Sequence, residues 1–187
     1  MSLKFYKFPV NKQVFHISKY TFAIVNLKPI VAGHVLVIPF RRVAKLAELP
    51  DVESVDFFRT VQRVEKFVTH LYFADGLNLG IQDGLAAGQS IPHVHCHIIP
   101  RYLKDGWGDG VYEALESSEG LLQNEWWKRV CKPLGETADE ERRVRTMEEM
   151  EREASWLKKE MMEWLQNNGE WLPEYDVDSN VDKIVQE

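Results

Sequence analysis

The chain has 187 residues, of which 44% are hydrophobic and 28% are charged, proportions that are ordinary for one soluble globular domain. Its net charge of −6 argues against a general nucleic-acid binder, which would carry a basic face. No apolar run approaches the roughly 20 residues of a membrane-spanning helix, and the N-terminus has no signal-peptide core. Two cysteines, Cys96 and Cys131, make no disulfide framework, so we expect a cytoplasmic protein, with the nucleus as a second compartment.

The first forty residues predict short strands joined by tight connections. Residues 3–8 alternate well enough for one short strand, and Pro9 ends it. Residues 14–17 and 21–26 predict a hairpin, and residues 34–39 form an apolar strand after a turn at Gly33. Connections this short favour antiparallel neighbours in one sheet.

A long amphipathic helix is predicted after Pro50. Apolar side chains recur there every three or four residues, at Val52, Val55, Phe58, Val61, Val64, Phe67, Val68 and Leu71. We therefore expect this helix to cover one face of the sheet with that stripe.

Residues 77–90 combine a strand pattern with a glycine-rich loop. Apolar residues alternate with polar ones up to Gln82, and the loop that follows is bracketed by Gly84 and Gly88. Such loops can turn backbone N–H groups toward an anion. A phosphate held there would have Gln82, Gln89 and Ser90 as its nearest polar side chains.

Three of the six histidines stand at alternate positions of residues 91–100, among mostly branched apolar residues. A period of two predicts a strand with His93, His95 and His97 on one face and the intervening apolar residues on the other. The row could consist of core histidines, hold a zinc ion, or act on a phosphate, with one ring as nucleophile and its neighbours as proton donors. The adjoining glycine-rich loop favours the third interpretation.

The last third of the chain predicts a loop and then a second helix. A capping-box pattern at residues 137–140 predicts a helix from there to about Gln166. Its apolar seam comprises Val144, Met147, Met150, Ala154, Leu157, Met161 and Trp164. The seam could dock on the helix's own domain or form an intermolecular coiled coil, and we favour docking.

The histidine row and the loop before it resemble a known family. Gln-Asp-Gly-x-x-Ala-Gly-Gln-Ser followed by His-Val-His-Cys-His-Ile-Ile-Pro-Arg is similar to the histidine triad (HIT) signature, His-φ-His-φ-His-φ-φ with φ apolar. The Gln82-Asp83-Gly84 and Pro100-Arg101 segments resemble the fragile histidine triad branch, the diadenosine polyphosphate hydrolases, more than the Hint branch. The galactose-1-phosphate uridylyltransferase branch has glutamine in place of the last histidine, whereas this chain has His97.

The resemblance implies an α+β, HIT-like fold: a five-stranded, mainly antiparallel sheet, a main helix and an added C-terminal helix. We expect a HIT domain over residues 1–115, a loop region over 116–136, and a C-terminal helical extension over 137–187 packed on the same domain. The resemblance also implies a homodimer whose two sheets adjoin.

The implied activity is hydrolysis of a dinucleoside polyphosphate, such as diadenosine triphosphate, to AMP and a nucleoside diphosphate. His95 would form a covalent nucleotidyl-histidine, His93 and His97 would assist, and His34 would support the triad through His93. A divalent cation, Mg²⁺ or Mn²⁺, would travel with the substrate, without a protein metal site or an organic cofactor.

The resemblance also assigns the nucleoside pocket. Asn26 would bind the ribose, and Phe5, Val25 and Leu36 would help to form the base pocket, although these apolar residues could equally be plain core. Two other functions stay open: a Hint-like phosphoramidase or adenylate hydrolase, and a nucleotide-bound signalling protein with slow turnover.

Overall fold

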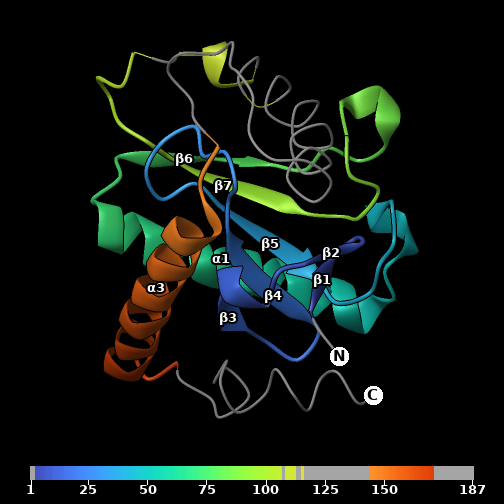
Figure 1. Cartoon of the computed structure of the whole chain (residues 1–187), viewed down its shortest axis with the longest axis horizontal. Helices are drawn as coiled ribbons and strands as arrows, with labels where there is room; N and C mark the ends of the chain where they lie inside the picture. Colours follow the sequence, from blue (N-terminus) through green and yellow to red (C-terminus); the bar gives the residue numbers. More distant parts are fainter. Residues whose placement is uncertain (1–2, 107, 113–114, 116–143, 171–187) are drawn as a thin grey trace.

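The computed structural model describes residues 3–106, 108–112, 115 and 144–170. Its centre is a five-stranded sheet in the order β3-β4-β5-β7-β6, in which every neighbouring pair is antiparallel (Figure 1). The strands are β3 (Val14–Ile17), β4 (Thr21–Val25), β5 (Val35–Pro39), β6 (Gly76–Gly80) and β7 (Cys96–Arg101). The predicted α+β architecture is therefore confirmed.

The N-terminal segment forms a hairpin instead of the single strand predicted for residues 3–8. Strands β1 (Lys4–Phe5) and β2 (Phe8–Pro9) pair antiparallel, and the chain reverses at Tyr6, whose φ of 55° lies in the left-handed region. The prediction was wrong because a two-residue reversal leaves the alternation of side chains almost undisturbed.

Helix α1 (Asp51–Tyr72) has the predicted span, but the first half of its buried stripe differs from the prediction. Val52, Val55 and Phe58 are exposed, and Glu53, Phe57 and Thr60 are buried instead. Polar contacts accompany this rotation: Glu53 accepts a bidentate hydrogen bond from Arg41, and Thr60 Oγ1 donates to Ser18 Oγ at 3.0 Å. From Val61 onward the stripe follows the expected positions.

Helix α3 (Met147–Asn167) begins ten residues later than predicted. Its N-cap is Thr146, whose side chain accepts a hydrogen bond from Glu149 N–H, while Glu149 Oε2 accepts one from Thr146 N–H. Residues 144–146 are not helical, and residues 137–143, where the start was predicted, lie outside the described residues. The predicted seam is largely correct, except that Met147 is exposed and Leu165 is buried.

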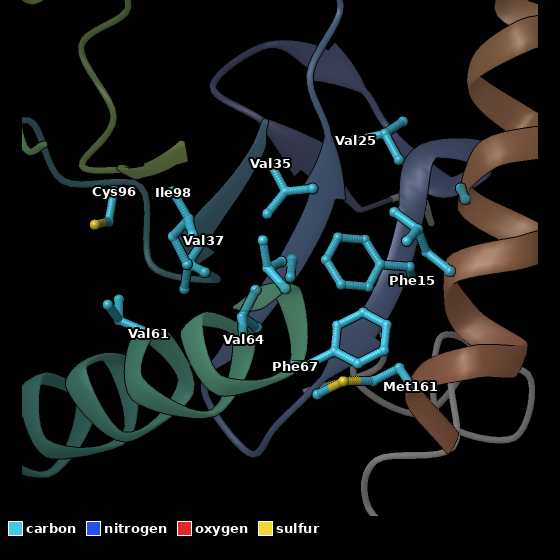
Figure 2. Close-up of a cluster of buried hydrophobic side chains, with 14 of the residues drawn as sticks. Phe15, Val25, Val35, Val37, Val61, Val64, Phe67, Cys96, Ile98 and Met161 are labelled. Carbon is cyan, nitrogen blue, oxygen red and sulfur yellow. The ribbon is translucent and has the colours of Figure 1, made fainter. Parts of the chain in front are cut away.

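The sheet separates two apolar clusters. On one face, α1 and α3 cover side chains of β3, β4, β5 and β7, including Phe15, Val25, Val37 and Ile98 (Figure 2). On the other face, the β1–β2 hairpin packs over Val14 and Ile17 of β3 and over alternate residues of β4 and β5. We call these the helix face and the site face, because the triad histidines point to the second.

The remaining predictions for the C-terminal third concern residues 116–136 and the tail after Glu170, which lie outside the described residues. Within the described ranges, no helix is long and apolar enough to cross a membrane. Helix α3 contacts the 3₁₀ turn Asn11–Gln13, β3, β4 and α1, so it docks on the core of the same chain.

Candidate active site

The histidine row lies only partly on a strand. β7 begins at Cys96, so His93 and His95 precede it, although a strand was predicted across residues 91–100. The two-sided arrangement nevertheless holds, because Val94, Cys96 and Ile98 pack in the helix-face cluster. The ring centroids of His95 and His97 are 4.9 Å apart on the site face.

His93 is held by two backbone groups. Its Nδ1 accepts a hydrogen bond from Tyr6 N–H at 2.9 Å, and its Nε2–H donates to Pro39 O at 2.9 Å. Burial lowers the pKa of His93 to about 4, although the hydrogen bond to Pro39 opposes the shift. The ring is therefore neutral near pH 7, with both nitrogens engaged.

His95 has a defined tautomer. Its Nδ1 lies 2.8 Å from the carbonyl oxygen of His93, which can only accept, so Nδ1 carries the proton and the lone pair lies on Nε2. A neutral imidazole with that lone pair is a nucleophile or a general base. The Phe5 ring packs edge-on against His95, with centroids 5.0 Å apart.

A chain of hydrogen bonds also sets the tautomer of His97. Ile30 N–H donates to His34 Nδ1 at 3.1 Å, so His34 carries its proton on Nε2. That Nε2–H donates to His97 Nδ1 at 3.0 Å, and His97 must then carry its own proton on Nε2. His97 thus becomes a hydrogen-bond donor at Nε2. The prediction that His34 acts through His93 was wrong, because His34 contacts His97.

Asn26 completes this group at the end of β4. Its Nδ2 lies 3.4 and 3.1 Å from the two nitrogens of His34, so it spans the ring edge instead of aiming at one atom. Its Oδ1 accepts a hydrogen bond from Lys28 N–H at 3.3 Å, which fixes the orientation of the amide. The structure therefore brings Asn26, His34 and His97 together.

The glycine-rich loop is a short turn between two glycines in the left-handed region. Gly84 and Gly88 have φ of 98° and 84° and flank the 3₁₀ turn Leu85–Ala87. The N–H groups of Ala87, Gly88 and Gln89 donate to carbonyls within the loop, at Gly84 and Leu85. These three amides are therefore occupied within the loop, and the binding of an anion by loop N–H groups stays a prediction.

The polar side chains predicted beside a phosphate occupy the two ends of this loop. Gln82 and Gln89 are buried, and Ser90 is half-buried. The side-chain amide of Gln89 donates from Nε2 to Ala44 O at 2.8 Å, which engages one of its two N–H groups. This bond anchors the loop to the segment that follows β5.

Val25, one of the predicted pocket residues, points away from the site face. Phe5 and Leu36 lie in the site-face cluster, whereas Val25 is packed on the helix face (Figure 2). Ile24, its neighbour in β4, lies in the site-face cluster instead. The sequence contained the signal, because Asn26 and Ile24 are two residues apart in the strand predicted over residues 21–26, and Val25 lies between them.

Comparisons with known proteins place this arrangement in a family. The family model described as HIT domain matches residues 8–104, just over half of the chain. The chain belongs to the HIT domain family. It is 46% identical to the asymmetrical bis(5′-nucleosyl)-tetraphosphatase of Schizosaccharomyces pombe, over 83% of this chain and 92% of that one. It is also 38% identical to the bis(5′-adenosyl)-triphosphatase of Saccharomyces cerevisiae, over 90% and 97% of the two chains.

Solved structures agree with this assignment. The NitFhit protein of C. elegans superposes with a TM-score of 0.61 and 29% identity. The match covers 84% of this HIT chain and 30% of the longer NitFhit chain. The diadenosine triphosphate hydrolase of Plasmodium falciparum, at 23% identity and a TM-score of 0.54, shares the fold.

Two further features of the HIT domain bear on its chemistry. In the described part of the chain, no group of three or more His, Cys, Asp or Glu side chains could hold a metal ion. Arg101, the last residue of β7, pairs with Asp105 and with Asn78 of β6, and Asn78 Nδ2 donates to Tyr112 OH at 3.0 Å. This network, which sequence patterns did not predict, ties the segment after β7 to the sheet edge.

Proposed function

We propose that this HIT protein hydrolyses dinucleoside polyphosphates of the diadenosine triphosphate type to AMP and a nucleoside diphosphate. The fungal relatives named as triphosphatase and tetraphosphatase match 83–90% of the chain. The observation that carries the proposal is the tautomer of His95, whose Nδ1–H is fixed on the His93 carbonyl.

The reaction would proceed in two displacements. His95 Nε2 attacks the α-phosphorus in line, a P–N bond forms, and the bond to the bridging oxygen breaks to release the nucleoside diphosphate. Water then attacks the nucleotidyl-histidine, the P–N bond breaks, and AMP leaves. His97 Nε2–H donates to a non-bridging oxygen during both steps. The hydrogen bond that His97 Nδ1 accepts from His34 supports this role, because it keeps the His97 proton on Nε2.

The rest of the site would position the substrate. Gln82, the second Nε2–H of Gln89 and Ser90 orient the phosphate chain. Asn26 binds the ribose, and Phe5, Ile24 and Leu36 form the wall of the base pocket. A divalent cation, Mg²⁺ or Mn²⁺, would accompany the polyphosphate as part of the substrate, because phosphate oxygens are ligands that such hard cations prefer.

We also propose a homodimer and an intracellular location. Strand β6 lies at the edge of the sheet, and Leu79 on it and Phe73 before it are 49% and 85% exposed, as an edge-to-edge interface would require. Light scattering should give twice the mass of one chain. The Leu79→Lys variant should have the mass of a single chain, because a charge at the interface would separate the dimer. A fluorescent fusion tests the cytoplasmic location, with the nucleus as the second compartment.

The decisive experiment is product analysis in oxygen-18 water. The protein is mixed with diadenosine triphosphate and Mg²⁺ and quenched without acid, which preserves phosphoramidate bonds. We expect AMP attached to His95 and one labelled oxygen in the released AMP. Label in the nucleoside diphosphate instead would contradict the attack at the α-phosphorus. A strong preference for an AMP–amine substrate would favour the Hint-like function instead.

A further inference from the structure

The segment that follows β5 forms a wall along the glycine-rich loop. Backbone or side-chain hydrogen bonds join it to the loop and the triad at four points: Pro39 to His93, Val43 to Val94, Ala44 to Gln89 and Leu46 to Asp83. These contacts range from 2.8 to 2.9 Å, so residues 39–46 follow the loop from the triad to its outer end.

Three cationic side chains lie on this wall: Arg41, Arg42 and Lys45. Arg41 is neutralised by Glu53, with Nε and Nη2 2.6–2.9 Å from the carboxylate oxygens. Within the described ranges, neither Arg42 nor Lys45 forms an ion pair. The wall therefore carries two positive charges without a bound carboxylate, in a chain whose net charge is −6.

These two cations lie next to the proposed path of the phosphates. A methyl group in place of a Gly84 hydrogen would lie 3.7 Å from Lys45 Cε, so the lysine side chain crosses the start of the loop. The guanidinium of Arg42 lies over the Tyr6 ring at 5.6 Å, and Tyr6 N–H is bonded to His93. The charge of Arg42 also reaches His93, because it contributes, after burial, to lowering the pKa of that ring.

The nearby carboxylates hold the wall in place rather than neutralising these cations. Asp83 accepts Leu46 N–H at 2.9 Å, and Glu48 accepts Ala44 N–H at 3.0 Å and Lys45 N–H at 3.4 Å. The backbone is thereby fixed, while the Lys45 and Arg42 side chains are exposed to solvent.

We propose that Lys45 and Arg42 form the subsite for the phosphates of the leaving nucleotide and favour substrates with a longer phosphate chain. This inference rests on the proposed function, which places the reacting phosphate at His95. Phosphates beyond it would then follow the loop toward its outer end, where polyphosphate oxygens accept charge-assisted hydrogen bonds from the ammonium and the guanidinium.

The test compares Lys45→Met with three substrates: diadenosine tetraphosphate, diadenosine triphosphate and adenosine 5′-phosphoramidate, which has only the reacting phosphate. We expect kcat/KM to fall about tenfold for the tetraphosphate, less for the triphosphate, and not at all for the phosphoramidate. Lys45→Arg should restore most of the loss. Lys19→Met is the matched control, because Lys19 is an exposed cation in the β3–β4 turn beside Tyr20. Equal losses for all three substrates, or none, would overturn the inference.

Calorimetry without turnover separates this inference from the proposed function. Lys45→Met should weaken ATP binding about tenfold and leave AMP binding unchanged, and Arg42→Gln in addition should weaken ATP binding further. A parent protein that hydrolyses neither dinucleotide yet shows this ATP-specific loss would reject the proposed function alone. Normal dinucleotide turnover with equal effects on ATP and AMP would reject the subsite alone.

Discussion

The two faces of the central sheet use the same alternating strands but bury different kinds of side chain. The helix face, under α1 and α3, is filled by apolar residues such as Phe15, Phe67 and Leu157. The site face also buries His34, His93, His95 and His97, each only 1–2% exposed. A short hairpin and loops cover that face. The nitrogens of His93 form hydrogen bonds with the backbone groups of Tyr6 and Pro39, which are far from it in sequence.

The two faces contribute differently to stability and to chemistry. An apolar cluster needs shape and volume, so its free energy depends on packing. A buried imidazole must have its N–H and lone pair engaged, or its burial is costly. Each of these hydrogen bonds also determines which ring nitrogen carries the proton. Folding of the site face therefore fixes which nitrogens can donate to a substrate or attack it. Substitutions on the helix face should therefore change stability, and those on the site face should change catalysis.

The largest effect is expected for His95→Asn. Asparagine cannot form the nucleotidyl intermediate, so kcat should fall by many orders of magnitude, whereas His97→Asn or Gln82→Ala should cost on the order of 10² to 10³. Substrate binding by His95→Asn should stay near that of the parent, measured by calorimetry. Near-normal turnover by His95→Asn would falsify the assignment of the nucleophile.

On the helix face, Phe67→Ala should lower the free energy of unfolding by about 3–5 kcal/mol, because its ring is buried against Phe15 and Trp164. Urea unfolding gives this value, and kcat per folded molecule should not change. Phe58→Ala is the control, since Phe58 is 47% exposed on the same helix. A loss of similar free energy of unfolding for Phe58→Ala would indicate that Phe58 is buried, as the sequence predicted.

The relay from His34 to His97 can be tested on the site face. His34→Phe removes the donor to His97 Nδ1, so the His97 proton can move to Nδ1 and leave Nε2 as an acceptor. We expect a loss of about 10² in kcat with a changed pH profile, and partial rescue by His34→Gln, whose amide can donate. Identical losses and unchanged pH profiles for both variants would contradict a role through the proton on His97.

The pH dependence of stability should reflect a buried histidine away from the site. Burial, with a smaller contribution from Arg63, lowers the pKa of His16 to about 3, well below the value of 6.5 for an unperturbed histidine. The unfolded chain therefore binds the proton first, and stability is lost as pH falls below 6.5. His16→Leu should reduce this slope by roughly 1.4 kcal/mol per pH unit between pH 6 and 4, measured by urea unfolding. An unchanged slope would show that His16 titrates normally in the fold.

The smallest expected effects distinguish two neighbours on β4. Ile24→Val should raise KM for the dinucleotide a few-fold with little loss of stability, because Ile24 faces the site. Val25→Ala should lower the free energy of unfolding by roughly 2 kcal/mol with KM unchanged, because Val25 faces the helices. A raised KM for Val25→Ala with an unchanged KM for Ile24→Val would place Val25, and not Ile24, in the nucleoside pocket.

Elements with strong local periodicity, and the motif that bears the site, could be predicted from the sequence alone. The hairpin of β3 and β4, the span of α1 and the separation of His95 and His97 from Cys96 all follow from side-chain period, which is a local property. The family resemblance was equally local, since it rests on consecutive residues. Even the choice of Ile24 over Val25 could have been made from the period of two.

The pairing of polar groups, in contrast, emerges only when the chain is folded. The proton positions in the site depend on Tyr6 with His93 and on His34 with His97, pairs 87 and 63 residues apart in sequence. The rotation of the first half of α1 likewise accompanies contacts from Arg41 and Ser18. No local pattern encodes such pairings, because a hydrogen bond depends on where two distant backbones approach each other, and the same contacts determine which ring nitrogen carries the proton.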